Sequence, residues 1–215
     1  MPDCRATRLL VSAADELTAQ VPLRPADVDP TRLAVVVGTA LGGVEEGERA
    51  LAGDGRGGGC AALSTMRRDT TSPAGSALAG MSLTVSTACA SGATAMGLGA
   101  DLLRQDMADL VVAGGYDVLC RFVMRGFDAL RSLTRDEVRP FDRRRSGLLL
   151  GEAGALVLLA READAGRRPL GWLRGHASTG DGSHISAPDP DGRGLERAVR
   201  LALAEADAAP ATWTS

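Results

Sequence analysis

Apolar positions in the first part of the chain follow two different periods. From Arg5 to Gln20 they recur every three or four residues, which predicts an amphipathic helix. From Leu33 to Val37 every position is apolar, which is typical of a strand covered on both faces, as in a parallel sheet. The pattern therefore predicts a helix followed by a buried strand.

A second change of period surrounds Cys89. From Ser82 to Thr87 β-branched residues are frequent and apolar positions alternate with polar ones, which predicts a strand. The stretch from Ala88 to Arg104 is rich in small residues and has two leucines near its end, which predicts a buried helix. Cys89 therefore lies at a predicted strand-to-helix joint.

The rest of the pattern alternates between helices and strands, which is typical of the α/β class. The segment Gly53–Gly59 is rich in glycine and is predicted to be a flexible loop. The further predicted elements are a short helix over Glu45–Ala52, a strand over Leu110–Ala113, a helix or helix-and-loop over Arg121–Leu133, strand-like structure over Gly147–Ala160, a strand over Leu170–His176 and an amphipathic helix over Gly192–Ala206.

Cys89 has the surroundings of a nucleophile if the predicted joint forms. The positive end of the helix dipole and the free N–H groups of the first turn both favour a thiolate. The same N–H groups can hold the oxyanion of a thioester under attack. The small neighbours Ala88, Ala90, Ser91 and Gly92 allow backbone and substrate to approach closely. This pattern suits acyl transfer to sulfur, and the alternative is that Cys89 is a small core residue.

Composition excludes several other function classes. The chain has 215 residues, of which 45% are hydrophobic, so it can bury a sizeable core. Its net charge of −3 and its aromatic content of 3% argue against generic binding of nucleic acid. It has neither the apolar region of a signal peptide nor a run long enough to span a membrane. We therefore expect a soluble, cytoplasmic protein with reduced thiols.

Metal and dinucleotide sites are not expected. The four cysteines, at positions 4, 60, 89 and 120, form no C-x-x-C pair, and the chain has only two histidines. The turn Gly38–Gly43 (GTALGG) does not spell the G-x-G-x-x-G fingerprint of a dinucleotide-binding loop.

Five ordered motifs together resemble the β-ketoacyl synthase family of the thiolase fold. The TACASG motif around Cys89, followed by DLVVAGG at Asp109–Gly115, is similar to the nucleophile region of that family. The other similar motifs are Val35–Gly43, Gly126–Leu133, Arg139–Ala155 and His184–Gly192. The last of these (HISAPDPDG) is similar to the H-M-T-A-P-D-P-D-G of the dissociated, type II enzymes.

The resemblance implies a fold and a reaction. The fold would be α/β and thiolase-like, approximately one βαβαβαββ half of the layered αβαβα architecture. Residues 1–215 would form an N-terminal-type domain without the family's first strand and C-terminal half. The implied reaction is that of a β-ketoacyl-[acyl-carrier-protein] synthase of fatty-acid or polyketide biosynthesis, an acyltransferase that performs decarboxylative condensation. No bound cofactor is implied, because phosphopantetheine arrives on the carrier protein or on coenzyme A.

The resemblance also assigns roles to single residues. It makes Cys89 the acyl-accepting nucleophile, places Phe127 near the substrate pocket and aligns Arg131 with a position that contacts the carrier protein. Phe127 is equally explained as a plain core residue, and a solvated charged face is the simplest explanation of a basic run. Yet a local basic patch in an acidic chain would attract an acidic carrier protein. The run comprises Arg131, Arg135, Arg139, Arg143, Arg144 and Arg145.

Two catalytic histidine segments of the family, H-G-T-x-T and G-H-x-x-G-A-A-G, do not occur in this sequence. We expect neither His176 nor His184 to be a catalytic base, and we expect Glu152 to be a structural hydrogen-bonding carboxylate. Three functions stay open: a synthase that is incomplete as a single chain, a degenerate partner subunit that binds carrier protein or a synthase, and acyl transfer without condensation. Half of a layered fold would expose an apolar face, so we expect a homodimer or a complementing synthase subunit.

Overall fold

The computed structural model describes residues 4–21, 29–53, 80–162, 168–185 and 187–209. All but the first residue of the predicted flexible loop 53–59 lies outside the described residues. The elements in chain order are α1 (Arg5–Gln20), a 3₁₀ turn (Pro30–Arg32), β1 (Leu33–Gly38), α2 (Val44–Leu51), β2 (Ser82–Val85), α4 (Ser91–Arg104), β3 (Leu110–Asp117), α5 (Arg121–Ala129), β4 (Ala153–Ala160) and α6 (Arg193–Glu205).

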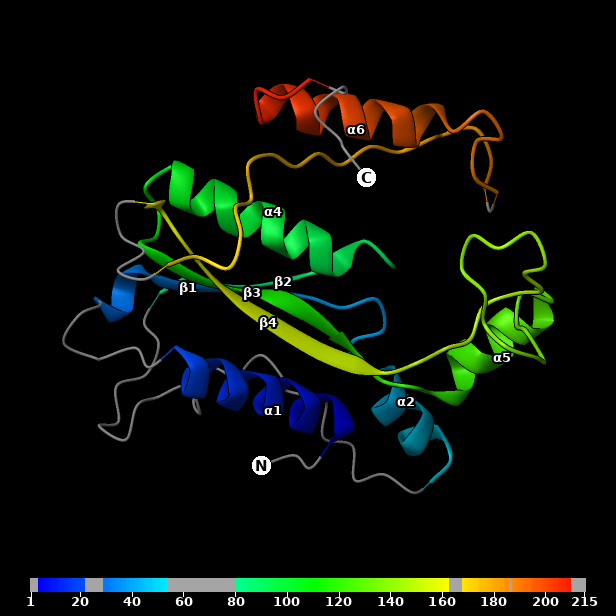
Figure 1. The fold of residues 1–215 in the computed structure, drawn as a ribbon. Helices are drawn as coiled ribbons and strands as arrows, with labels where there is room; N and C mark the ends of the chain where they lie inside the picture. The colour runs from blue at the N-terminus through cyan, green and yellow to red at the C-terminus, as the bar shows by residue number, and fades with distance from the viewer. Residues whose placement is uncertain (1–3, 22–28, 54–79, 163–167, 186, 210–215) are drawn as a thin grey trace.

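A four-stranded sheet in the order β2-β1-β3-β4 forms the centre of the described structure. The first three strands are parallel, and β4 is antiparallel to β3. Helix α1 covers one face of the sheet and α4 covers the other (Figure 1). The alternation of strands and helices confirms the predicted α/β class.

Strand β1 contributes to a core on each face of this sheet, as its continuous apolar run predicts. Val35 and Val37 pack in the same cluster as Leu10 of α1. Ala34 and Val36 point to the other face, into a cluster that contains residues of α4. Successive side chains of a strand alternate between faces, so every position of a strand inside a three-layer arrangement must be apolar.

The strand-like structure predicted over Gly147–Ala160 is present only in its second half. Residues 147–150 bond instead to the segment after α5: the Leu148 N–H donates to Ser132 O at 2.9 Å, and Leu148 O accepts from the Thr134 N–H at 2.9 Å. Gly147 has φ of 151°, and a Cβ there would lie 2.6 Å from Ser132 O. Leu148 therefore bonds away from β3, and the pairing of β4 with β3 begins later, at Ala153.

The predicted strand Leu170–His176 is wrong. The segment pairs with no strand of the described structure and runs between α4 and α6 (Figure 1). Side chains bond to two of its backbone groups: the Arg104 guanidinium donates to Arg174 O at 3.2 Å, and the His176 N–H donates to Glu205 Oε2 at 2.6 Å. The segment is therefore extended, but its backbone bonds to side chains of neighbouring helices and not to another strand.

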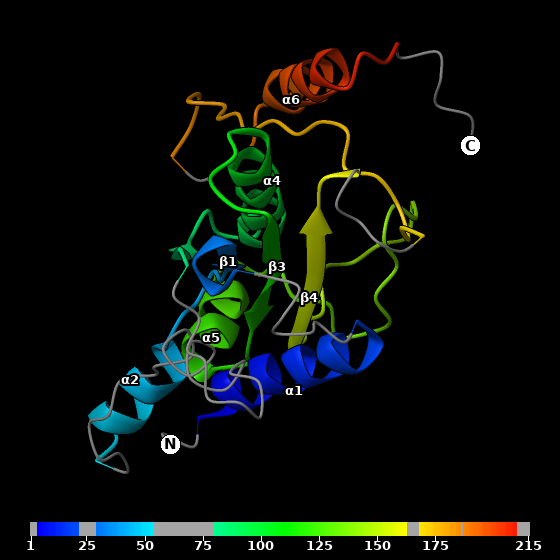
Figure 2. The same cartoon turned by 90° about the vertical axis from the view of Figure 1, so that its left-hand side faces the viewer.

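Helix α6 forms where predicted but lies on the outer side of α4, apart from the sheet (Figure 2). Several large apolar side chains stay exposed on α6, on α5 and between them. They include Phe122, Phe141, Leu170, Trp172, Ile185, Leu195 and Leu201. No helix among the described residues is long and apolar enough to cross a bilayer.

Candidate active site

The predicted joint at Cys89 is a tight elbow between β2 and α4. Ala88 adopts a left-handed conformation with φ of 52°, which turns the chain sharply. The buried Ser91 hydroxyl ties the turn together: it accepts from the Thr87 N–H at 2.9 Å and donates to Ala88 O at 2.5 Å. The residue before the helix, Ala90, has no side chain to cap it, so Ser91 stabilises the elbow from inside the first turn.

Cys89 is exposed at the tip of this elbow, directly before the first turn of α4. The thiol therefore lies outside both core clusters of the described residues. The N–H groups of Gly92 and Ala93 belong to the first helical turn, where no intrahelical acceptor is available. An anion at this end of a helix is stabilised by these N–H groups and by the helix dipole.

Glycines allow the elbow to sit directly on the strand ends. A Cβ on Gly38, the last residue of β1, would lie 2.1 Å from Ser91 O. A Cβ on Gly115 of β3 would lie 3.2 Å from the Gly92 Cα. Larger residues at these two positions would push the first turn of α4 away from the carboxyl ends of β1 and β3.

A carboxylate that the sequence analysis missed organises the neighbouring turn. Asp117, at the end of β3, accepts hydrogen bonds from the Thr39 hydroxyl at 2.8 Å and from the Leu41 N–H at 2.9 Å. The Thr39 N–H in turn donates to Val85 O, at the end of β2, at 3.1 Å. Carboxyl ends of neighbouring parallel strands share one sheet edge. The available signal was therefore a polar residue shortly after two predicted strands, Thr39 after Leu33–Val37 and Asp117 after Leu110–Ala113.

Glu152 is the structural carboxylate that its small neighbours predicted. It accepts from the Leu119 N–H at 3.1 Å and pairs with the Arg5 guanidinium, which joins the start of α1 to the segment after β3. The Leu119 N–H, followed by Arg5, holds the pKa of the Glu152 carboxyl below its usual range. Since its oxygens are engaged by these donors, Glu152 is not arranged as a general base.

Phe127 lies on α5 and Arg131 follows its end, and α5 lies beyond the carboxyl end of β3 (Figure 1). Phe127 is half-buried, and Arg131 is exposed with φ of 53°. No hydrogen bond or ion pair in the described structure joins either residue to residues 86–91. Their pocket and docking roles therefore stay predictions.

The arginine run after α5 is only partly neutralised. Arg139 pairs with Asp136 at 3.0 Å, and Arg144 pairs with Asp142 at 3.2 Å. The hydrogen bond from Arg144 holds the pKa of the Asp142 carboxyl below its usual range. Four members of the run are exposed and form no ion pair with any described residue: Arg131, Arg135, Arg143 and Arg145, of which Arg145 donates a hydrogen bond to the backbone Asp142 O at 3.0 Å. Two of the six arginines in the run are therefore neutralised by nearby carboxylates, and the others keep their positive charge exposed.

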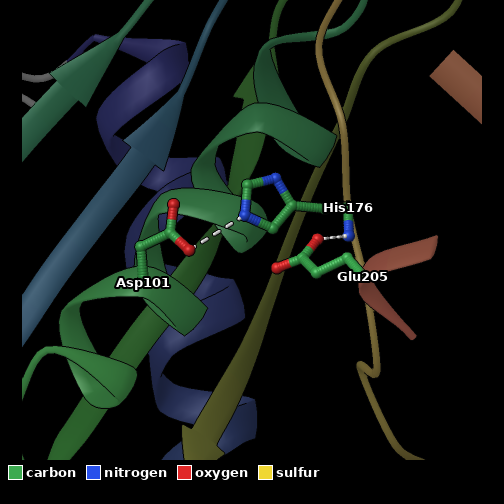
Figure 3. Close-up of side chains that lie close together, drawn as sticks. All are labelled: Asp101, His176 and Glu205. Carbon is green, nitrogen blue, oxygen red and sulfur yellow. Dashed lines mark hydrogen bonds and ion pairs between the residues drawn. The ribbon is translucent and has the colours of Figure 1, made fainter. Parts of the chain in front are cut away.

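Both histidines lie away from the elbow or are engaged elsewhere. His184 is exposed, and its Nδ1 accepts from the Ala187 N–H at 2.9 Å. His176 lies between Asp101 and Glu205 (Figure 3), in the one group of possible metal ligands among the described residues. Asp101 follows the start of α4 by about 15 Å along the helix axis, which is the rise of ten residues. Neither ring is therefore arranged as a base for Cys89.

The family model described as "Beta-ketoacyl synthase, N-terminal domain" matches residues 4–165. The tetracenomycin polyketide synthase ketoacyl synthase alpha subunit of Streptomyces glaucescens is 32% identical, over 94% of this chain and 53% of the relative. The 3-oxoacyl-[acyl-carrier-protein] synthase 2 of Mycobacterium tuberculosis is 35% identical, over 86% of this chain and 48% of the relative.

Solved structures of ketosynthases are also similar to this chain. A ketosynthase from Xenorhabdus doucetiae, in complex with its chain length factor, has a TM-score of 0.82 and 32% identity, over 97% of this chain and 53% of that one. The ishigamide ketosynthase/chain length factor has a TM-score of 0.80 and 30% identity, over 95% of this chain and 53% of that one. The chain spans about half the length of the relatives that it matches.

Proposed function

The chain belongs to the β-ketoacyl synthase family, and on that premise we propose that it provides the acyl-accepting part of a β-ketoacyl-[acyl-carrier-protein] synthase of fatty-acid or polyketide biosynthesis. The observation that carries the proposal is the exposed Cys89 on the Ser91-tied elbow, directly before the first turn of α4. The description of residues 1–215 as an N-terminal-type domain stays a prediction beside the matched range 4–165.

Acyl transfer to Cys89 needs only groups that the elbow supplies. The sulfur attacks the carbonyl carbon of an acyl-phosphopantetheine thioester, and a carbon–sulfur bond forms as the carbonyl electrons move to oxygen. The first-turn N–H groups are available to stabilise that oxyanion. Its collapse breaks the original thioester bond, and the released phosphopantetheine thiolate takes up the proton that Cys89 lost. The acyl group then stays on Cys89.

Condensation is proposed only for an assembly that supplies the missing histidines. In the family, two histidines hold the malonyl thioester oxygen and promote loss of carbon dioxide, and neither of their segments occurs in these 215 residues. The described histidines lie too far from the elbow or accept other bonds. The complete reaction of the relatives therefore goes beyond what these residues support by themselves.

We propose that the chain acts in the cytoplasm and that it has two kinds of partner. One is a second synthase subunit or a second copy, because large apolar side chains are exposed and relatives are known in complex with a chain length factor. The other is an acyl carrier protein, which the name of the mycobacterial relative includes. The exposed, unpaired Arg131, with Arg135 and Arg143, is the proposed docking charge.

The test of the nucleophile is intact-protein mass spectrometry after incubation with acyl-carrier-protein or acyl-coenzyme A thioester. We expect one acyl adduct on the unmodified protein and none on Cys89→Ala. Cys120→Ala is the matched control, because Cys120 is buried and its loss should leave the adduct. No adduct on the unmodified protein, or an adduct that survives in Cys89→Ala, would contradict the proposal.

The docking charge is tested by reversing single arginines. Arg131→Glu should raise the apparent KM for carrier-bound acyl substrate about threefold to tenfold, as expected for loss of electrostatic steering, and leave the KM for acyl-coenzyme A unchanged. Arg144→Glu is the control, because Arg144 is already paired with Asp142. Equal effects of both variants on carrier-bound substrate would count against a specific role of Arg131.

A non-catalytic partner subunit is the second candidate, favoured by the exposed apolar side chains of α5 and α6. It predicts tight association with a synthase or a carrier protein together with no acylation of Cys89. The mass measurement therefore separates the two functions directly.

A further inference from the structure

The carboxylate of Asp117, the last residue of β3, holds the turn that follows β1. Its Oδ1 atom accepts from the Thr39 hydroxyl at 2.8 Å and from the Leu41 N–H at 2.9 Å. The Ala40 N–H lies 3.1 Å from both carboxylate oxygens. These donors are all uncharged, and no ion pair joins Asp117 to any described residue. The carboxylate is therefore arranged to order a turn and not to form a salt bridge.

The turn closes around the same carboxylate. The Thr39 hydroxyl, which donates to Asp117, also accepts from the Gly42 N–H at 2.8 Å. Thr39 is 5% exposed, and Gly42 has φ of 55°, a left-handed conformation that glycine adopts without strain. Every backbone N–H from Ala40 to Gly42 is thus bonded to Asp117 or to the hydroxyl that Asp117 holds.

This turn is bonded to the strand that leads into the elbow. The Thr39 N–H donates to O of Val85, the last residue of β2, at 3.1 Å. Thr87 follows shortly after Val85 and begins the elbow, and its N–H donates to the Ser91 hydroxyl at 2.9 Å. A series of hydrogen bonds and short chain segments therefore connects the turn to the residues on both sides of Cys89.

Close packing links the turn to the start of α4 as well. Gly38 directly precedes Thr39, and a Cβ on Gly38 would lie 2.1 Å from Ser91 O and 2.7 Å from Gly92 N. The backbone of the helix start therefore rests on the end of β1, with no side chain between them. A shift of this strand end would move the first-turn N–H groups that follow Cys89 in the chain.

The elbow needs support from outside because its own conformation is unfavourable. Ala88 has φ of 52°, a conformation that costs a non-glycine residue free energy and persists only where the surroundings enforce it. Ala90, the residue before α4, makes no side-chain hydrogen bond that caps the helix. Ser91 ties the elbow from inside, and the contacts from β1 and β2 hold it from outside.

We propose that Asp117 is a positioning residue for Cys89: by ordering the turn after β1, it keeps the elbow in the geometry that places the sulfur at the start of α4. Asp117 is not a catalytic residue, because its oxygens are bonded to the turn and no hydrogen bond joins it to Cys89 in the described structure. The inference rests on the proposed function, in which Cys89 is the reacting group. It extends that function to β3, which carries the group that orients the nucleophile.

Alkylation of Cys89 by iodoacetamide at neutral pH tests the positioning without an acyl substrate. N–H groups at the start of a helix stabilise an anionic sulfur, so a relaxed elbow should react more slowly. We expect Asp117→Ala to lower the alkylation rate of Cys89 about threefold to tenfold, measured by peptide mass spectrometry. Cys4 and Cys120 are buried and should stay unmodified in a folded chain. A merely structural role of Asp117 would instead expose all three thiols and raise their rates together.

Two further variants test the hydrogen bonds themselves. Asp117→Asn keeps an oxygen for the Thr39 hydroxyl and the Leu41 N–H, so it should recover most of the alkylation rate. Asp109→Ala is the matched control, because it removes a carboxylate at the opposite end of the same strand. It should lower the free energy of unfolding and leave the alkylation rate of Cys89 unchanged.

Acylation from an acyl-carrier-protein thioester gives a second readout. Asp117→Ala should lower the acylation rate at saturating thioester and leave the apparent KM unchanged, because the turn orients the sulfur and does not bind the substrate. An unmodified protein that accepts no acyl group would contradict the proposed function, whereas the alkylation rates would still decide the role of Asp117.

Three results would overturn the inference. One is an unchanged alkylation rate of Cys89 in Asp117→Ala, and another is an equal loss of rate in Asp109→Ala. The third is an Asp117→Asn variant that reacts as slowly as Asp117→Ala, because it would mean that the hydrogen bonds to the turn do not position the sulfur.

Discussion

Helices α1 and α6 have the same kind of amphipathic sequence pattern, but they bury their apolar faces to different extents. In both, apolar residues recur with the period of an amphipathic helix, and both form close to where this period predicts. Leu10 of α1 is completely buried against the sheet, whereas Leu195 of α6 is 72% exposed. An amphipathic pattern therefore determines that a helix forms, but not what covers its apolar face.

The two helices are consequently held by different forces. Helix α1 is held by burial of its apolar face, in the cluster that also contains Val35 and Val37. Helix α6 is held by Arg104, His176 and their carboxylate partners. Salt does not screen apolar burial, and pH affects it only weakly, while exposed charge pairs respond to both.

Truncating one leucine in each helix gives the largest expected contrast. Leu10→Ala should lower the free energy of unfolding by about 2–5 kcal/mol, because it leaves a cavity in a closed core. Leu195→Ala should change it by about 0.5 kcal/mol or less, because the side chain is already exposed. Equilibrium unfolding in urea measures both. Similar losses would mean that the face of α6 is covered in solution, by a second copy or a partner.

Acid should affect the sheet through an ionic cluster at the amino ends of β1 and β3 and the carboxyl end of the antiparallel β4. Asp109 accepts from Arg32 at 2.7 Å and from Arg161 at 2.7 Å. The hydrogen bond from Arg32, followed by that from Arg161, lowers the pKa of the Asp109 carboxyl to about 2. Since this pKa is lowered on folding, the stabilisation is complete above the unfolded value of about 4 and disappears as the pH falls toward 2.

Asp109→Asn should therefore flatten the acid limb of the stability curve between about pH 4 and 2, measured by thermal unfolding at each pH. Asp136→Asn is a suitable control, because its pair with Arg139 is solvent-exposed and local in sequence. An acid limb that is identical in the Asp109 variant and the unmodified protein would assign it to other carboxylates.

Salt should produce the smallest effect, but it should distinguish the two helices most clearly, because only α6 is expected to respond. At about 1 M NaCl the screening length falls to about 3 Å, so the attraction of Arg104 for Glu205 weakens. We expect the hydrogen-exchange protection of α6 to fall about twofold and that of α1 to stay constant. Loss of protection in α1 alone would reverse the comparison.

The sequence predicted local structure well where one period was strong. The helix Arg5–Gln20 and the buried strand from Leu33 agree with the structure, and solved ketosynthases confirm the thiolase-like α/β fold. The prediction failed at Leu170–His176, where an extended, partly apolar segment found side-chain partners instead of a strand. Strand propensity depends on a neighbour that the local sequence does not contain.

The candidate site was predicted in part. The position of Cys89 at a strand-to-helix joint follows from the change of period on either side of it, and the structure has this joint. The supporting roles of Ser91 and Asp117 were missed. Asp117 bonds to Thr39, 78 residues earlier in the chain, because two parallel strands end at one edge of the sheet.

The sequence by itself determined the periods of the helices and strands, the elbow at Cys89 and the family. These are properties of neighbouring residues, since backbone geometry repeats over a few positions. Only the tertiary structure decided which apolar faces are covered and which charges meet. Asp101 and His176 are 75 residues apart, and they meet because the segment before α6 runs along α4 (Figure 1). That arrangement depends on the packing of the whole chain, to which every element contributes and which no local pattern encodes.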